Sequence, residues 1–229
     1  MSVVVTRKPA AFAAILLTAV GIIWLIAEAI SASAFPGYSY ATNYISDLGV
    51  PEVSTFEGRT IDSPLSAVMN FAFIAQGLLL MAGVIFAVRA VSIPRGAART
   101  WILAVAIAHG IGMLLVGIFH GSEVNIANGF IILHVLGATV AIITGNVVAI
   151  LAGLQSRRVD VPSWYRVVSV ALGIIGLISL VMLVIVKTTT FPALPEPVWE
   201  RGAVYTITAW ELMSGLALFA SMRRSRRLA

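Results

Sequence analysis

Six runs of mostly apolar residues follow one another along this chain, and each is long enough to cross a membrane as a helix. A helix rises about 1.5 Å per residue, so about 20 apolar residues span a hydrocarbon core about 30 Å thick. Hydrophobic residues make up 59% of the 229 residues and charged residues only 11%, which is typical of an integral membrane protein. The sequence predicts an all-α fold, a single transmembrane domain over 1–229, with six spans near 10–34, 64–88, 100–120, 127–153, 164–187 and 200–222.

The basic residues indicate how this bundle is oriented. An even number of spans places both termini on one side of the membrane. Only Arg59, Lys187 and Arg201 then lie on the opposite side, and twelve of the fifteen basic residues share the side of the termini. Basic residues collect in cytoplasmic connections, so we expect cytoplasmic termini. The twelve are Arg7, Lys8, Arg89, Arg95, Arg99, Arg157, Arg158, Arg166, Arg223, Arg224, Arg226 and Arg227.

Charge and cysteine content exclude several classes of function. The basic residues that produce the net charge of +5 flank apolar runs, so they predict topology and no nucleic-acid partner. The sequence has no cysteine, which excludes disulfides, thiolate metal sites and a cysteine nucleophile. Membrane lipids are the expected partners, and no feature of the sequence sets an oligomeric state.

The first apolar run has a competing interpretation as a cleaved secretory signal. Arg7 and Lys8, the apolar stretch and Ala32-Ser33-Ala34 imitate the charged, apolar and cleavage regions of such a signal. However, the apolar region of a signal has about 7–15 residues, whereas this run has about 25 and contains Glu28. We therefore expect the first span to be retained.

Ionisable side chains occur in or beside the apolar runs at Glu28, His109, His120, His134 and Glu211. At membrane depth each costs at least about 2.5 kcal/mol, so such a group usually faces the protein interior and marks a functional site. Counted at about 1.5 Å per residue, Glu28, Asn70 and His134 lie about 9–10 Å below the outer surface. Glu211 and His109 lie deeper, at about 15 Å. We expect an outward-opening polar cavity with these two residues as its floor.

Helical phase relates the histidines to their neighbours. His109 and His120 are eleven residues apart, which returns to within about 20° around a helix, so we expect both to face one vestibule. His134 shares a helix face with small residues that permit close packing, namely Gly137, Ala138, Ala141 and Gly145.

The same side chains also have structural interpretations, which stay open. A histidine in a membrane helix is often a packed residue bonded to a neighbour. Asn70, Gln76 and Asn146 can serve to join helices through hydrogen bonds. Glu28 and Glu211 can be neutral acids, since burial raises the pKa of a carboxyl group, or they can pair with a histidine or Arg201.

The connection over residues 35–63 is the one long loop, and its composition is unusual for a linker. It contains Tyr38, Tyr40 and Tyr44, together with hydroxyl, amide and acidic side chains. Tyr40, Tyr44, Ile45 and Leu48 have helical spacing, so the sequence predicts a short amphipathic helix across the outer mouth. We expect this loop to act as a lid, with substrate contacts from Tyr38, Ser39, Tyr44, Ser46, Asn70 and His109.

Short motifs in this chain resemble a known family. Tyr38-Ser39, Ile45-Ser46-Asp47-Leu48-Gly49 and the run His134-Val135-Leu136-Gly137-Ala138 are similar to small polytopic bacterial and archaeal membrane proteins, a family catalogued as a domain of unknown function. The resemblance covers nearly the whole chain in span count and order. It implies a six-span bundle in a bacterial cytoplasmic membrane, and it carries no established activity.

A weaker likeness is to membrane-embedded hydrolases of the ceramidase and receptor superfamily, which use Ser, Asp and His around zinc. Ser46, Asp47 and the histidines supply those residue types, but the usual H-x-x-x-H pair is missing and one span is lacking. A catalytic zinc takes three protein ligands and keeps an open position. The candidate zinc ligands here are His120, His134 and Glu28.

Three classes of function follow. The first is an enzyme or binding protein for lipid at the outer leaflet, with catalytic groups drawn from His134, Glu28, Glu211, His120 and Asp47. The second is a proton-coupled small-molecule transporter with Glu211 and His109 as relay groups. The third is a non-catalytic membrane protein that binds a lipid or a partner span. Bis-histidine haem is disfavoured, because His109 and His134 differ in depth by about 5 Å.

Overall fold

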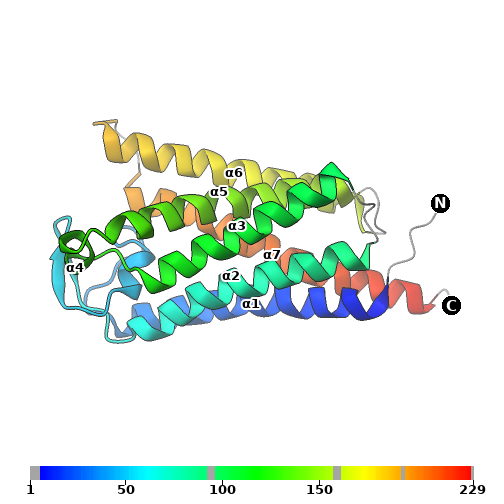
Figure 1. The fold of residues 1–229 in the computed structure, drawn as a ribbon, viewed down its shortest axis with the longest axis horizontal. Coiled ribbons are helices and arrows are strands. Elements are labelled where there is room, and N and C mark those ends of the chain that lie inside the picture. Colours follow the sequence, from blue (N-terminus) through cyan, green and yellow to red (C-terminus); the bar gives the residue numbers. More distant parts are fainter. Residues whose placement is uncertain (1–5, 92–95, 157–160, 192–193, 228–229) are drawn as a thin grey trace.

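The computed structural model describes residues 6–91, 96–156, 161–191 and 194–227, and long helices dominate it (Figure 1). Six helices are long and apolar enough to cross a membrane: α1 (Arg7–Ala34), α2 (Ser66–Ala90), α3 (Ala97–Ile118), α5 (Ile131–Gln155), α6 (Ser163–Thr188) and α7 (Glu196–Arg227). The short elements are the 3₁₀ helix η1 (Ser46–Gly49), the strands β1 (Ser54–Phe56) and β2 (Arg59–Ile61), and the helix α4 (Glu123–Ala127). The predicted all-α fold with six helices long and apolar enough to cross a membrane is confirmed.

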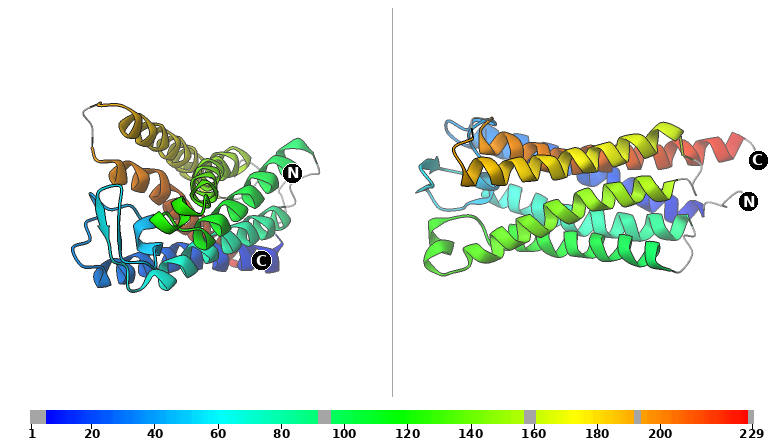
Figure 2. Two further views of the ribbon diagram at one scale, coloured as in Figure 1. Left: turned by 60° about the vertical axis from the view of Figure 1, so that its left-hand side comes forward. Right: turned by 90° about the horizontal axis from the view of Figure 1, so that it is seen from above.

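The long helices pack as a closed ring in the order α1, α2, α3, α5, α6, α7, with α7 returning to α1 (Figure 2). α7 also contacts α5 across the ring. Glycines allow close approach, since a Cβ on Gly77 of α2 would lie 2.8 Å from the carbonyl oxygen of Gly110 on α3. Likewise, a Cβ on Gly112 of α3 would lie 2.7 Å from the carbonyl oxygen of Gly137 on α5. Such contacts supply the van der Waals packing that holds helices together in lipid.

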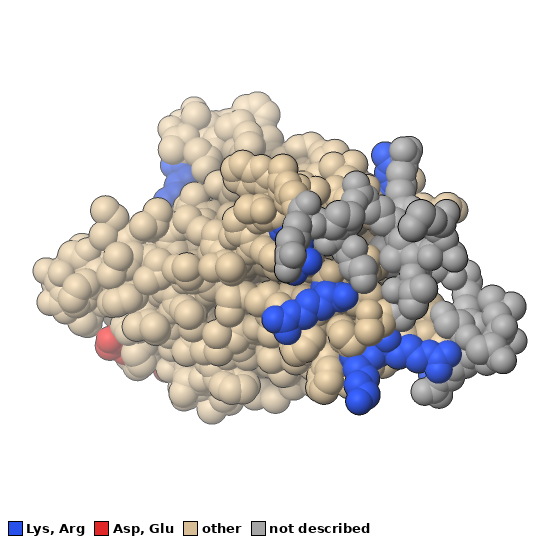
Figure 3. Space-filling view, turned by 45° about the vertical axis from the view of Figure 1, so that its right-hand side comes forward, with Lys and Arg blue, Asp and Glu red and all other residues tan. Residues whose placement is uncertain are grey.

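The bundle has two different ends. We call the end that carries residues 35–65 and α4 the loop end, and the opposite end, where both termini lie, the terminal end (Figure 1). Lys and Arg side chains gather at the terminal end (Figure 3). Arg7 and Lys8 begin α1 there, and Arg89 lies in the last turn of α2. Of the predicted cytoplasmic bases, those outside the described residues are Arg95, Arg157 and Arg158, and the side chains of Arg224, Arg226 and Arg227.

The loop folds differently from the prediction, because η1 and a β-hairpin stand in place of an amphipathic α-helix. Asp47 Oδ2 accepts a hydrogen bond from the backbone N–H of Tyr44 at 3.0 Å, a local bond that competes with helix formation. β1 and β2 pair antiparallel around a tight turn at Glu57 and Gly58, whose φ values of 48° and 78° suit a primed hairpin turn. Ile45 and Leu48 are nevertheless buried in the core at the bundle mouth, so the predicted inward face is partly correct.

The end of α3 corrects the predicted relation between His109 and His120. α3 ends at Ile118, so His120 lies beyond the helix in the connection to α4. A shared helical face therefore does not exist. His109 is buried within the bundle, whereas His120 bonds to Ser122 in the loop at 2.9 Å.

Candidate functional site

A buried arginine on α7 joins three parts of the molecule at the loop end. Arg201 Nη2 lies 3.5 Å from Glu28 Oε1 on α1, and Tyr205 donates its hydroxyl to the same Glu28 oxygen at 2.8 Å. Glu28 is 2% exposed and Arg201 6% exposed, so both charges are almost entirely removed from solvent. A buried ion pair is tolerated only where further hydrogen bonds satisfy its groups. Tyr205 supplies one of those bonds.

The same guanidinium ties α7 to the loop. Arg201 Nη1 donates to the backbone carbonyl of Asn43 at 2.7 Å, and Nη2 also donates to the hydroxyl of Tyr38. The guanidinium carbon lies 5.0 Å from the ring centroid of Tyr40, within cation–π distance. Arg201 is therefore one of the residues that hold the loop over the bundle.

Asp47 organises the loop itself. Its carboxylate accepts from Arg59 Nε at 3.0 Å and Arg59 Nη2 at 3.3 Å, and from the Asn43 side chain at 3.3 Å. Burial and the carboxylate of Glu196 raise the pKa of nearby Tyr44, so its hydroxyl stays protonated and donates to Glu196. The oxygens of Asp47 are thus engaged in holding the loop together.

A small cavity lies beneath the loop, inside the helix ring. Its volume is about 60 Å³, and Trp24, Phe73 and Met113 contribute to its apolar wall. His134, Glu200 and Ser46 are its polar residues. We call this the loop-end cavity. It lies in the loop-end half of the bundle, at the depth where the sequence predicts a polar cavity.

His134 enters this cavity in a defined orientation. Its Nδ1 lies 2.7 Å from the carbonyl oxygen of Phe119, and a carbonyl only accepts, so Nδ1 carries a proton and donates. In the neutral ring Nε2 then has a free lone pair. Nε2 faces Gly121, where an added Cβ would lie 3.3 Å away. An imidazole held this way can accept a proton or a hydrogen bond from a ligand.

A second buried group lies near the middle of the helices. Gln76 of α2 donates its amide N–H to Glu211 Oε1 of α7 at 2.8 Å, and the Gln76 amide oxygen lies 2.5 Å from His109 Nε2 of α3. His109 Nδ1 lies 2.8 Å from the carbonyl oxygen of Ala141 on α5. We call Glu211, Gln76 and His109 the central triad. It links four helices, and its members are 0–3% exposed.

Packing around the triad leaves room for the imidazole only because α5 has a glycine there. A Cβ on Gly145 would lie 2.8 Å from His109 Nδ1 and 2.6 Å from a methyl carbon of Ile207. The sequence predicts that Gly145 lies on the same helix face as His134, and both are buried. The small face of this helix therefore seats His109.

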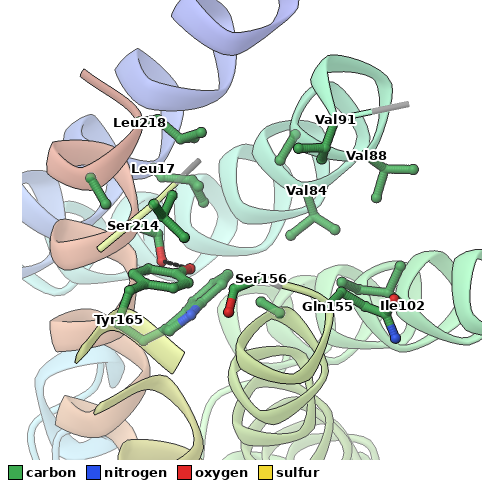
Figure 4. A pocket seen from close by; sticks show the side chains of 15 residues that line it. Leu17, Val84, Val88, Val91, Ile102, Gln155, Ser156, Tyr165, Ser214 and Leu218 are labelled. Carbon is green, nitrogen blue, oxygen red and sulfur yellow. Dashed lines mark hydrogen bonds between the residues drawn. The ribbon is translucent and has the colours of Figure 1, made fainter. Parts of the chain in front are cut away.

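A further cavity lies on the other side of the triad. Its volume is about 80 Å³, and Leu17, Val84 and Ile102 are among the apolar side chains that line it (Figure 4). Tyr165 and Ser214 meet in it, and their hydroxyl oxygens are 2.8 Å apart (Figure 4). We call this the terminal-end cavity. Along α7, Val204 lines the first cavity and Ser214 the second, with Glu211 between them.

Comparison with known proteins identifies the family. The family model described as "Protein of unknown function (DUF998)" matches residues 5–217, which include the first five spans and most of α7. The chain belongs to the DUF998 family. Membership agrees with the resemblance that the loop and His134 motifs indicate. No curated protein and no solved structure matches the chain.

In this DUF998 chain Glu28 and Glu211, the two glutamates within the apolar runs, belong to separate hydrogen-bond networks. Glu28 bonds to Arg201 and Tyr205, whereas Glu211 bonds to Gln76. Tyr205 and Glu211 are six residues apart, which is about 9 Å along α7. Each carboxylate therefore has its own set of hydrogen-bond partners.

The remaining predicted site residues lie in the loop or at its edge. Asn70 donates its amide to the backbone carbonyl of Gly49 at 2.8 Å, so it fastens η1 to α2. Ser39 accepts from the backbone N–H of Ala41 at 3.2 Å. His120 Nδ1 lies 3.6 Å from Glu52, which forms an ion pair only when the imidazole is protonated. None of the three lines the loop-end cavity.

The candidate zinc ligands do not meet. Glu28 bonds to Tyr205, His134 to the Phe119 carbonyl and His120 to Ser122. Within the described ranges, no three His, Asp or Glu side chains have the spacing of a metal site. The zinc hypothesis stays a prediction.

Several functional candidates emerge only in three dimensions. The sequence predicts that Gln76 joins helices. In the structure it does so by bridging two ionisable groups, Glu211 and His109. The sequence predicts that Glu200 is an acid of the outer connection. In the structure it lines the loop-end cavity and accepts a hydrogen bond from the Ile45 backbone N–H at 2.7 Å. Tyr205 follows Arg201 by four residues, so helical spacing is the signal that relates the two.

Proposed function

We propose that this protein is a proton-coupled carrier of a small, largely apolar molecule, with its termini on the cytoplasmic side. One observation carries the proposal: a hydrogen-bonded Glu211–Gln76–His109 triad separates two cavities that lie toward opposite ends of the bundle. Ionisable groups at membrane depth are costly and occur mainly in ion, proton and substrate pathways. Two such groups between two cavities have the arrangement that proton coupling requires.

The cavity walls define the class of cargo. The loop-end cavity combines aromatic and aliphatic side chains with His134, Glu200 and Ser46, and the terminal-end cavity is apolar apart from Tyr165, Ser214, Gln155 and Ser156. Such walls favour an apolar molecule with one or two polar groups over a sugar or a phosphate. At about 60 and 80 Å³ each cavity holds only a small group in this conformation, so passage requires the helices to move.

Reconstitution tests the proposal. Proteoliposomes that contain a pH-sensitive dye are challenged with small apolar acids, alcohols and amines under an imposed pH gradient. We expect at least one compound to drive a proton flux above that of empty liposomes. The flux should be lost in Glu211→Gln and retained in the matched control Glu57→Gln, whose side chain is 44% exposed on the hairpin. Equal fluxes from wild type and Glu211→Gln for every compound would contradict coupling through the triad.

The orientation of His134 favours a second candidate, an acid–base enzyme that acts on lipid at the loop end. Its donated Nδ1–H leaves Nε2 with a lone pair that can act as a base, on a residue that lines the loop-end cavity together with Ser46. Purified protein incubated with labelled bilayer lipids should then form a product that His134→Gln does not form. Absence of lipid turnover by the wild-type protein would remove this candidate.

A further inference from the structure

Hydrogen-bond geometry in the central triad restricts where protons can be. His109 Nδ1 faces the carbonyl oxygen of Ala141, which only accepts, so Nδ1 carries a proton. With the Gln76 amide as oriented, its oxygen faces His109 Nε2 at 2.5 Å, so this nitrogen also has to carry a proton. His109 is then an imidazolium, and Glu211 is the carboxylate that accepts from the Gln76 N–H.

Turning the Gln76 amide by 180° gives an alternative with the same number of protons. Amide oxygen and nitrogen are interchangeable in position and are assigned from their hydrogen-bond partners. In the turned arrangement, protonated Glu211 donates to the Gln76 oxygen, and the Gln76 N–H donates to the lone pair of neutral His109. Each arrangement satisfies every hydrogen bond between the three side chains, and the triad is neutral overall in both.

From this geometry we propose that Glu211, Gln76 and His109 form one site for a single proton, which resides on Glu211 or on His109 according to the orientation of the Gln76 amide. Removing the proton leaves a buried carboxylate without a counter-charge and turns a lone pair of His109 toward an oxygen. Adding a second proton leaves a buried imidazolium without a counter-charge. Both changes place a lone charge in the membrane interior, which is strongly unfavourable.

The surroundings of the triad leave this balance to its own members. Apart from Tyr165, other ionisable groups on the packed helices are about 9–20 Å away along their helices, counted from the nearest triad residue or its direct partner. On the described parts of these helices they include Arg89 on α2, Arg99 on α3, His134 on α5, and Tyr205 with its partner Glu28 at the α1–α7 contact. Tyr165 of α6 approaches from the terminal-end cavity, where its hydroxyl bonds to Ser214.

The carboxyl group of Glu211 has one oxygen that takes no part in the bonds of the triad. Its Oε2 is buried and has no hydrogen-bond partner in the described part of the chain, whereas Oε1 is bonded to Gln76. A role of the triad in transport rests on the proposed carrier function. The two arrangements of the triad differ in how tightly they hold together the helices that separate the two cavities. The charged arrangement ties α7 to α2 and α2 to α3 through charge-assisted bonds, which are stronger than the neutral bonds of the other arrangement.

Spectroscopic titration of the full chain in nanodiscs tests the single-proton site. Nitrogen NMR reports the charge of the His109 ring, and the infrared carboxylic-acid band reports protonation of Glu211. We expect both signals in the wild-type protein to change at one shared pH midpoint. In Gln76→Met, which keeps the side-chain length but removes both hydrogen bonds, the two midpoints should separate by about one pH unit or more.

Controls make each outcome decisive. Gln155→Met makes the same substitution at a glutamine that lines the terminal-end cavity, and it should keep the shared midpoint. Should Gln76→Met fail to fold, Glu211→Gln serves instead, and it should shift the His109 midpoint. Separate midpoints in the wild type, a shared midpoint in Gln76→Met, or an unmoved His109 midpoint in Glu211→Gln would overturn the proposal. The titration uses no cargo and no gradient, so it is independent of the flux assay. Loss of flux in Glu211→Gln together with separate midpoints in the wild type would refute the single-proton site and leave the carrier function standing.

Discussion

At the scale of single residues, the structure separates side chains that are already satisfied from those that remain available. Asp47 directs its carboxylate to Arg59, Asn43 and the Tyr44 backbone, and all of these bonds serve the loop. His134 uses one ring nitrogen to fix its orientation, its other ring nitrogen faces Gly121, and the residue lines the loop-end cavity. Residue type alone predicts both as catalytic, and only the partners distinguish them.

The buried pair of Arg201 and Glu28 gives a prediction about stability. Replacing Arg201 with Met leaves Glu28 as a buried carboxylate without its cationic partner, although it keeps the hydrogen bond from the Tyr205 hydroxyl. Removal of one partner from a buried ion pair typically costs about 3–5 kcal/mol. We expect Arg201→Met to lower the free energy of unfolding in micelles by an amount in that range.

The double variant distinguishes the lost pair from lost loop contacts. Arg201→Met combined with Glu28→Gln removes the stranded charge, so it should be more stable than Arg201→Met alone. Denaturant unfolding, followed by circular dichroism, gives the free energy of unfolding of the wild type, of Arg201→Met and of the double variant. A double variant less stable than Arg201→Met would mean that the loop contacts of Arg201, and not the stranded carboxylate, dominate its contribution.

At the scale of elements, apolar length predicts the spans well and local polar bonds decide the loop. Each predicted span overlaps its helix because lipid requires a continuous helical segment of sufficient length. The spacing of Tyr40, Tyr44, Ile45 and Leu48 suggests a helix, but periodicity does not register the competing bonds of Asp47. Likewise, the periodic pattern continues to His120 and does not predict that α3 ends at Ile118.

Asn70 offers a test of how η1 is held. The side-chain amide of Asn70 donates a hydrogen bond to the Gly49 carbonyl. A second hydrogen bond runs from Ser63 Oγ to the Leu48 carbonyl at 2.7 Å. A buried hydrogen bond contributes about 1 kcal/mol net, and an orphaned carbonyl costs more. Asn70→Leu should therefore speed amide hydrogen exchange in residues 46–50 by several-fold. Exchange in α5 serves as the internal reference, and equal acceleration there would indicate global destabilisation instead.

The tyrosines of the loop predict its release at alkaline pH. Burial, with the carboxylate of Glu196, raises the pKa of Tyr44, and burial raises that of Tyr38 against the opposing effect of Arg201. A folded-state pKa above the unfolded value means that the stabilisation is complete below about pH 10, the unfolded value, and is lost as the pH rises. Limited proteolysis within residues 35–63 should accelerate above that pH. Tyr44→Phe should reduce this dependence, and an unchanged pH profile in that variant would exclude Tyr44 as its source.

At the scale of the whole molecule, hydrogen bonds between distant spans could not be derived from the sequence. Span depth places Glu211 and His109 at a similar level, and the structure does bring them together. The bridge between them depends on α2 lying between α3 and α1, with α7 beyond, and pattern reasoning does not supply that ring order. Depth likewise placed Glu28 near His134, but helix rotation turns Glu28 toward Arg201.

Orientation in the membrane is the prediction that belongs to the entire chain. Twelve basic residues share the side of the termini, so the positive-inside rule places the terminal end in the cytoplasm and the loop end outside. The sequence has no cysteine, so single introduced cysteines report accessibility without background. Val53, 75% exposed beside β1, and Thr6, exposed before α1, are suitable positions at opposite ends.

In intact cells, a membrane-impermeant maleimide should label Val53→Cys and should label Thr6→Cys only after the membrane is permeabilised. The reverse pattern would place the loop end in the cytoplasm. The loop-end cavity, which His134 and Glu200 line, would then lie toward the cytoplasm. The central triad would keep its place between the cavities, so the proposed single-proton site does not depend on which side the loop faces.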